Sequence, residues 1–152
     1  MEKTMVKEYS WKLDYRVKLG DVYTRFFEGL KDKKILGNKC GKCGRIYIPP
    51  KPFCDICFVE PTEWLEAEHK GTVTSFTVCY QKFENLPEPP YISGIIKIGN
   101  SAISFVHFIG GIECDNPKEL PSKIKIGMEV EPVWAPERVG DMLDIEYFKP
   151  VK

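Results

Sequence analysis

The feature that most constrains this chain is a set of four cysteines arranged as two closely spaced pairs. They follow the pattern C-x2-C-x10-C-x2-C, in the order Cys40, Cys43, Cys54 and Cys57. Each C-x2-C unit tightens the backbone so that two thiolates point toward one metal ion, and four thiolates make the closed tetrahedron that structural zinc prefers. Because cysteine fills every position, no coordination site stays open for a substrate. We predict structural Zn²⁺, with iron bound by the same thiolates as an alternative.

Length and charge exclude several classes of protein. The chain has 152 residues, enough for one domain or for two small ones that share a surface. Lys and Arg number 22 and Asp and Glu number 22, so the formal net charge is +0. No apolar run approaches the roughly 20 residues that span a bilayer, and residues 1–8 lack the apolar core of a signal peptide. We therefore expect a cytoplasmic protein, where paired cysteines mean metal more often than disulfide.

Residues 1–36 are predicted to form an N-terminal arm and a helix that starts at an Asp21 N-cap. Apolar side chains recur there at helical spacing. These side chains are Tyr23, Phe26, Phe27 and Leu30. They either pack against the rest of the chain, which we favour, or form a surface for a partner or ligand. Trp11 adds aromatic surface upstream.

Residues 37–67 are predicted to form the metal ribbon, with a strand at 45–48 and a proline-rich turn at 49–52. Residues 68–152 are rich in β-branched and aromatic residues between turn signals. The predicted strands there are 71–80, 91–98, 101–108, 128–134 and 142–148. Five strands, with a longer connection between the third and fourth, match an OB-fold. The predicted fold class is mainly β with an N-terminal helix: a four-cysteine zinc ribbon followed by a five-stranded OB-fold barrel.

The proline-rich loop at residues 83–91 lies where OB-folds commonly bind ligands. Phe83 and Tyr91 are therefore candidate ligand-surface residues, although an ordinary hairpin connection explains the loop equally well. His107 lies among apolar residues of the third strand, and we interpret it as a hydrogen-bonded barrel residue. His69 lies in a charged linker and is predicted to be exposed. Neither histidine has a nucleophile or acid partner at a recognisable spacing.

Several short motifs occur in an order that resembles the DUF35 family. They are RFFEGL at residues 25–30, CGKCGR at 40–45, PPKPFCDIC at 49–57, EW at 63–64, GTV at 71–73 and IGMEV at 126–130. The resemblance spans most of the chain. It implies a rubredoxin-like zinc ribbon paired with an OB-fold.

Members of this family are typically found alongside thiolase-like enzymes that condense or cleave acyl-CoA thioesters. The resemblance therefore implies a non-catalytic accessory or scaffold subunit that docks to such an enzyme. It also leaves open a contribution to binding coenzyme A or acyl-CoA as a ligand. The family name by itself identifies neither the partner enzyme nor the acyl chain.

Two other function classes have weaker support. A single-stranded nucleic-acid binder needs a basic groove, yet Lys97 stands nearly alone in the second and third strands. The last two strands carry acidic residues that would repel phosphate, namely Glu129, Glu131, Asp144 and Glu146. Lysines do cluster between residues 31 and 51, where they would equally suit the phosphates of coenzyme A. A stand-alone enzyme is disfavoured because neither a phosphate loop nor a nucleophile elbow is visible.

Overall fold

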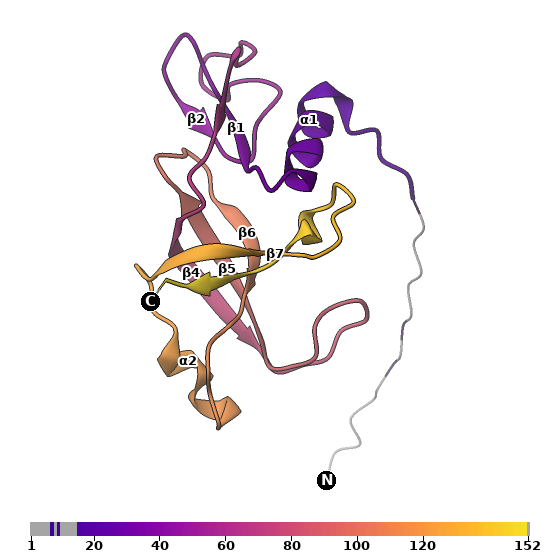
Figure 1. The fold of residues 1–152 in the computed structure, drawn as a ribbon, viewed down its shortest axis with the longest axis vertical. Helices are drawn as coiled ribbons and strands as arrows, with labels where there is room; N and C mark the ends of the chain where they lie inside the picture. The colour runs from indigo at the N-terminus through magenta and orange to yellow at the C-terminus, as the bar shows by residue number, and fades with distance from the viewer. Residues whose placement is uncertain (1–6, 8, 10–14, 152) are drawn as a thin grey trace.

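The computed structural model describes residues 7, 9 and 15–151. Trp11 and most of the polar N-terminal segment lie outside the described residues. Helix α1 (Gly20–Lys31) comes first, a small sheet follows, and a barrel completes the chain (Figure 1). The small sheet comprises β1 (Leu36–Lys39), β2 (Ile46–Tyr47) and β3 (Glu63–Glu66). The barrel strands are β4 (Gly71–Cys79), β5 (Tyr91–Ile98), β6 (Phe105–Ile109), β7 (Glu129–Trp134) and β8 (Ile145–Pro150). This architecture confirms the predicted fold class.

The five barrel strands are hydrogen-bonded in the order β4-β5-β6-β8-β7. Antiparallel pairing of β4 with β7, at Gly71 and Val130, closes the barrel, while β6 and β8 meet in parallel at Ile109 and Phe148. Closure removes the unpaired edges on which another chain could add. A bulge shifts the register of β4 between Val73 and Ser75, which re-aims the side chains beyond it.

Two predicted strands begin several residues later than expected. The third starts at Phe105 rather than at residue 101, because Ser101 turns toward the ribbon and is 3% exposed. The fifth starts at Ile145, because Met142–Asp144 form a short 3-10 helix, η2, whose first turn is capped by Asp141. The longer connection predicted between the third and fourth strands contains two short helices, η1 (Pro117–Glu119) and α2 (Leu120–Lys123).

Helix α1 (Gly20–Lys31) begins one residue before the predicted cap. Leu19 occupies the N-cap position, and Gly20 takes a left-handed φ of 66° that turns the chain into the helix. The Asp21 cap prediction is therefore wrong. The Asp21 carboxylate instead lies in the first turn, where it interacts favourably with the helix dipole.

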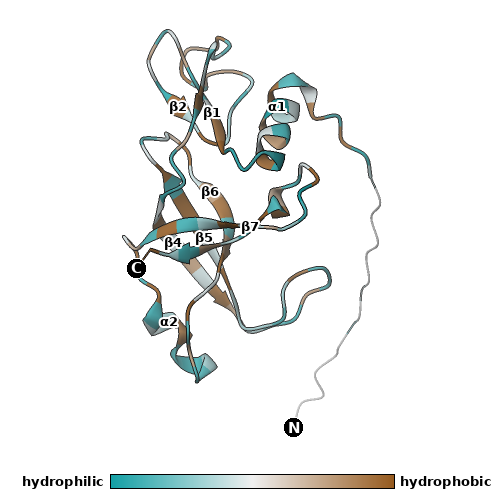
Figure 2. Cartoon of the chain, in the orientation of Figure 1, coloured by the Kyte–Doolittle hydropathy of each residue, from teal (hydrophilic) through white to brown (hydrophobic). Residues whose placement is uncertain are grey.

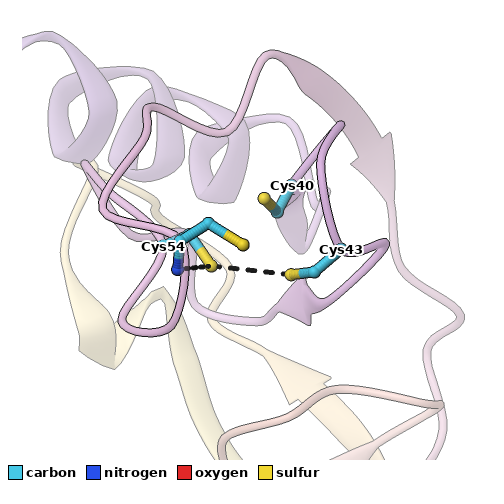
Figure 3. A group of neighbouring side chains, drawn as sticks. Cys40, Cys43 and Cys54 are labelled. Atoms are coloured by element: carbon cyan, nitrogen blue, oxygen red, sulfur yellow. Dashed lines mark hydrogen bonds between the residues drawn. The ribbon is translucent and has the colours of Figure 1, made fainter.

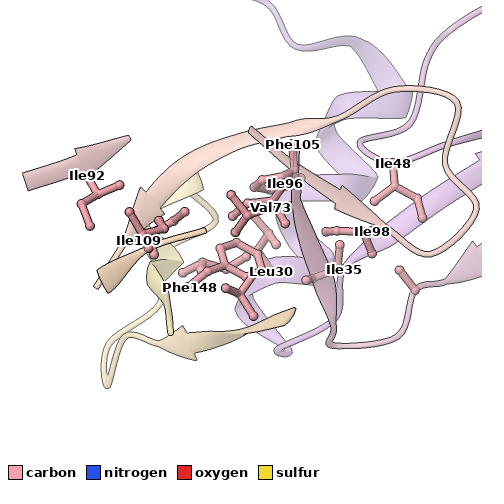
Figure 4. Close-up of a cluster of buried hydrophobic side chains, with 14 of the residues drawn as sticks. Leu30, Ile35, Ile48, Val73, Ile92, Ile96, Ile98, Phe105, Ile109 and Phe148 are labelled. Carbon is pink, nitrogen blue, oxygen red and sulfur yellow. The ribbon is translucent and has the colours of Figure 1, made fainter. Parts of the chain in front are cut away.

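One hydrophobic core joins the helix, the small sheet and the barrel (Figure 4). Phe26 and Leu30 of α1 pack in the same cluster as Ile35 and Ile48 from the first half of the chain and Phe105 of β6. The rings of Phe26 and Phe105 lie 6.4 Å apart. Burying these side chains supplies the largest favourable term in folding, so the helix helps to fix the ribbon on the barrel.

Hydrogen bonds with backbone N–H donors join the ribbon to the barrel. The Ile48 N–H donates to Ser101 Oγ at 3.0 Å, and the Ala102 N–H donates to the Ile46 carbonyl at 2.8 Å. The bonded groups belong to Ile46 of β2, to Ile48 just after β2, and to the turn that follows β5. These bonds hold the small sheet against one end of the barrel.

Hydrophobic residues gather along the barrel strands, with hydrophilic residues on many of the turns (Figure 2). The described residues contain no helix with the length and apolar character required to cross a membrane.

Candidate metal centre and ligand surfaces

The two cysteine pairs lie in turns with the same backbone hydrogen bonds. In the first turn the Gly44 N–H donates to the Cys40 carbonyl at 2.8 Å, and the Cys40 N–H donates to the Arg45 carbonyl at 2.9 Å. In the second turn the equivalent bonds join Phe58 to Cys54 at 2.9 Å and Cys54 to Val59 at 2.8 Å. Each turn therefore presents its two thiols in the same way. We call them the first and second knuckles, residues 40–45 and 54–59.

The four thiol sulfurs converge on one point. All four lie within 4.8 Å of one another, and the sulfurs of Cys43 and Cys54 are 3.6 Å apart. Figure 3 shows the sulfurs of Cys40, Cys43 and Cys54 turned toward a common centre. Zinc–sulfur bonds of about 2.3 Å in a tetrahedron place sulfurs roughly 3.8 Å apart. The thiols are free rather than disulfide-bonded, so this donor set fits a tetrahedral metal ion.

The Tyr47 side chain forms hydrogen bonds with two residues of the second knuckle. Its side chain is fully buried, and its hydroxyl lies 2.5 Å from Asp55 Oδ1 and 3.1 Å from Cys54 Sγ, which share its one proton. The Tyr47 hydroxyl, with the Cys57 N–H at 3.4 Å, lowers the pKa of Cys54 to about 6. It also lowers the pKa of Asp55, while burial raises the pKa of Tyr47 itself. The network therefore favours the thiolate form that binds metal.

Cys57 behaves differently from its neighbour. Burial, together with hydrogen bonding to the surrounding thiols, raises the pKa of Cys57 to about 12. The raised pKa favours the protonated thiol in the absence of metal, whereas a metal ion binds the thiolate. Metal binding by the cluster is therefore accompanied by proton release.

The predicted partner-surface residues of α1 differ in their exposure to solvent. Phe26 is 1% exposed and Leu30 is 0% exposed. These two side chains fill the core and cannot contact a partner, which corrects that expectation for them. Phe27 is half-buried against the same core. Tyr23, at 37% exposed, remains available on the surface.

Tyr23 borders a cleft of about 610 Å³ between the first turns of α1 and the ribbon. Trp64 of β3 also lines this cleft, and the Arg25 guanidinium carbon sits 4.3 Å from the Trp64 ring centre. That cation–π contact fixes the cleft wall. Asp21 and Glu60 also line it, so its charge is mixed.

The two candidate residues of the proline-rich loop also lie in different surroundings. Phe83 is 47% exposed, whereas Tyr91 is 9% exposed and lines a pocket on the outer face of the barrel. His107 is buried, as predicted. The Phe108 N–H donates to His107 Nδ1 at 2.9 Å, so Nε2 carries the hydrogen and donates to the Met142 carbonyl at 3.0 Å.

The second knuckle exposes apolar side chains that the sequence analysis missed. Phe58 is 80% exposed, and its neighbours on the knuckle and just before it are also exposed. The set comprises Phe53, Ile56, Phe58 and Val59, which we call the knuckle patch. The sequence did contain a signal for this patch. Apolar residues flank the cysteines of the second knuckle, although the geometry of the turn does not require apolar side chains.

Much of the predicted basic cluster is neutralised by carboxylates. Lys39 Nζ lies 2.8 Å from Glu63, and Lys51 Nζ lies 3.4 Å from Asp55. Lys34 is paired with Glu66 at 3.8 Å. These pairs leave a smaller positive field than the sequence pattern suggested.

Two family models match adjacent parts of the chain. The model described as "ChsH2, rubredoxin-like zinc ribbon domain" matches residues 27–63, and "ChsH2, C-terminal OB-fold domain" matches residues 64–135. Together they cover both the knuckles and most of the barrel. The two matches therefore place a zinc ribbon domain directly before an OB-fold domain in this chain.

Two curated proteins are similar in sequence. The "Probable enoyl-CoA hydratase alpha subunit" of Thermomonospora curvata is 26% identical over 125 residues, which cover 82% of this chain and 36% of that relative. The chain thus spans about a third of that protein's length. A "DUF35 domain-containing scaffold protein" of Methanocaldococcus jannaschii is 29% identical over 127 residues, covering 78% of this chain and 82% of the relative.

Two solved structures share the fold. A DUF35-family protein of unknown function from Sulfolobus solfataricus has a TM-score of 0.62 at 25% identity, with 86% of this chain and 82% of that chain covered. A structure described as "Ltp2-ChsH2(DUF35) aldolase" also has a TM-score of 0.62, at 26% identity, with 83% and 91% covered. With its zinc ribbon, its OB-fold barrel and these relatives, the chain belongs to the DUF35 family.

Proposed function

We propose that this chain is a non-catalytic accessory subunit that docks to a thiolase-like enzyme acting on acyl-CoA thioesters, and that it contributes to binding CoA or acyl-CoA. The observation that carries the proposal is the similarity to a DUF35 chain whose structure is described as an aldolase formed with Ltp2. The names of the two curated relatives, a hydratase subunit and a scaffold protein, point the same way.

The metal has a structural role in this proposal. Cys40, Cys43, Cys54 and Cys57 hold Zn²⁺, and all four ligands come from the protein. The ion supplies the folding energy that a ribbon with only two- and four-residue strands lacks. The ion thereby fixes the position of the second knuckle, including its exposed apolar side chains.

The docking surface in this proposal is the metal-bearing end of the molecule. The knuckle patch is exposed there, and Tyr23 and Leu19 of the α1 entry are exposed beside the ribbon cleft. Exposed apolar groups gathered at one end are typical of protein interfaces. Phe58 adds a further argument, because it holds a left-handed φ of 54° that disfavours side chains with a Cβ atom.

The first experiment is an affinity purification from the native cell extract. The tagged, zinc-loaded chain is expected to recover a thiolase or related condensing enzyme, identified by mass spectrometry. The pair is then purified, and its turnover of an acyl-CoA substrate is compared with and without this chain. We expect the enzyme to depend on the chain and the chain alone to give no turnover.

Matched variants test the docking surface. Phe58→Gly and Phe53→Ser should weaken binding to the purified partner at least tenfold, since aromatic anchors carry much of an interface's energy. Ile126→Ser removes a side chain of comparable exposure, 69%, from the loop before β7 and should bind normally. Recovery of nucleic acid or a ribonucleoprotein instead of an acyl-CoA enzyme would overturn the proposal. Turnover by the isolated chain would overturn its non-catalytic part.

A further inference from the structure

A pocket of about 500 Å³ lies on the outer face of the barrel. It is bounded by β4, β5 and β6, by the loop that follows β4, and by η2. Its volume falls within the range of about 300–1,000 Å³ that small-molecule sites occupy.

The strand register creates the hollow. Thr77 of β4 lies opposite Ser93 of β5, and Ser93 lies opposite Phe108 of β6. Cys79 lies opposite Tyr91 in the same antiparallel pair. Three small side chains therefore form a floor, and two aromatic rings stand beside it. On a flat sheet surface such a step in side-chain size leaves a depression.

The walls are apolar and come from separate elements. Leu86 belongs to the loop between β4 and β5, Val106 to β6, and Met142 and Leu143 to η2. The His107 Nε2–H donates to the Met142 carbonyl at 3.0 Å, which holds η2 against the barrel. A half-buried hydrogen bond therefore holds this wall in addition to packing.

The lining carries no formal charge. Among its residues, all of which the structure describes, there is no Asp, Glu, Lys or Arg. Burial lowers the pKa of His107, so its ring stays neutral at pH 7. A phosphate or carboxylate would lose its hydration here without gaining a counter-charge. An apolar chain would bury its surface, and the hydroxyls of Thr77 and Ser93 could donate to its carbonyl.

We propose that this pocket binds the acyl portion of a thioester, with the carbonyl toward Thr77 and Ser93 and the chain against Leu86, Val106 and Leu143. The choice of a thioester rests on the proposed function, whereas the preference for a neutral apolar group rests on the lining alone. The nucleotide portion of an acyl-CoA lies outside the pocket.

A neutral thioester without a nucleotide tests this directly. The zinc-loaded, ¹⁵N-labelled full chain is titrated with S-octanoyl-N-acetylcysteamine and followed by amide NMR shifts. We expect saturable shifts confined to residues 77–79, 91–93, 106–108 and 142–143, with a Kd of about 0.1–1 mM for a ligand of this size. Affinity should fall from octanoyl to butyryl to acetyl, by up to about fourfold for each methylene removed.

Substitutions at outward-facing positions test ligand binding without disturbing the buried core. Ser93→Phe fills the floor and should weaken octanoyl binding at least tenfold. Val106→Ser, at a side chain that is 64% exposed, removes a wall without touching the core and should weaken it severalfold. Ile126→Phe changes an exposed residue outside the pocket and should leave binding unchanged.

The outcomes distinguish this inference from the proposed function. If the partner enzyme is recovered but the octanoyl thioester gives no saturable shifts, the acyl pocket is refuted and the accessory role stands. Equal affinity across the three chain lengths also refutes it. Pocket shifts caused by CoA alone or by oligothymidine, rather than by the octanoyl thioester, refute the preference for neutral ligands. Saturable, length-dependent binding that Ser93→Phe removes supports the site even if no thiolase is recovered.

Discussion

Gly44 and Phe58 occupy equivalent positions in the two knuckles, and both have left-handed backbone, with φ of 73° and 54°. Their N–H groups donate to the carbonyls of Cys40 and Cys54 in matching hydrogen bonds. Glycine adopts this conformation freely, whereas a residue with a Cβ atom loses about 1–2 kcal/mol. The second knuckle therefore retains an exposed phenylalanine where a glycine would fit better.

This relationship predicts opposite effects for two exchanges. Gly44→Ala should lower the free energy of unfolding by about 1 kcal/mol or more, because it introduces the left-handed strain. Phe58→Gly should leave it unchanged or raise it by at most about 1 kcal/mol, since the lost side chain is 80% exposed. Chemical denaturation of both variants checks this. A loss above about 1 kcal/mol in Phe58→Gly would show that the ring stabilises the isolated chain.

Metal removal should unfold the ribbon and weaken the whole chain. Elemental analysis is expected to give one zinc per chain, and chelation should lower the Tm by about 10 °C or more, because the ribbon depends on its ion and shares one core with the barrel. Cys54→Ser should have the same effect. Cys79→Ser, which alters a half-buried thiol outside the cluster, should retain the zinc. A metal-free chain with an unchanged Tm would contradict a structural role.

Tyr47→Phe tests the hydroxyl beneath the second knuckle. The variant keeps the ring but removes the donor shared by Asp55 and Cys54, so the free energy of unfolding should fall by about 1–3 kcal/mol. Zinc should remain bound, since all four thiols are intact. Tyr80→Phe is the matched control: its hydroxyl donates to the Pro117 carbonyl at 3.0 Å from an exposed side chain. Equal losses in the two variants would argue against a special role for Tyr47.

His107 should make the chain less stable in mild acid. Burial holds its folded-state pKa below 6.5, so below that pH the unfolded chain binds a proton that the folded chain does not. The stabilisation is complete above about pH 6.5 and is lost as the pH falls toward the lower folded value. Denaturation at fixed excess zinc from pH 7.5 to 5 should show a shallower decline for His107→Gln than for the parent.

His69→Gln is the control for that experiment, because it removes the other histidine of the chain from an exposed position. Its profile should follow that of the parent. A parent and a His107→Gln variant with parallel profiles would mean that other groups account for the acid sensitivity.

Local patterns in the sequence were sufficient for the ribbon and the barrel strands. The C-x2-C spacing brings two thiols together within one turn, and the isoleucine-rich run at 91–98, between a proline-rich loop and a Gly-Asn turn, indicates a strand. These are properties of a few consecutive residues, so they can be recognised without knowing what packs on them. The start of the strand at Phe105 was missed because its cause, the hydrogen bond from Ile48 to Ser101, spans 53 positions.

The sequence alone thus determined the metal-binding pattern, the class of fold and the family, because these depend on spacing and order along the chain. Only the tertiary structure decided which aromatic residues are available to a partner. Phe26 and Tyr23 lie one turn apart in the same helix, yet the first is buried against Phe105 and the second is exposed. The barrel pocket likewise depends on the register that sets Thr77 beside Ser93. Burial and concavity arise from contacts between distant segments, and no local pattern encodes them.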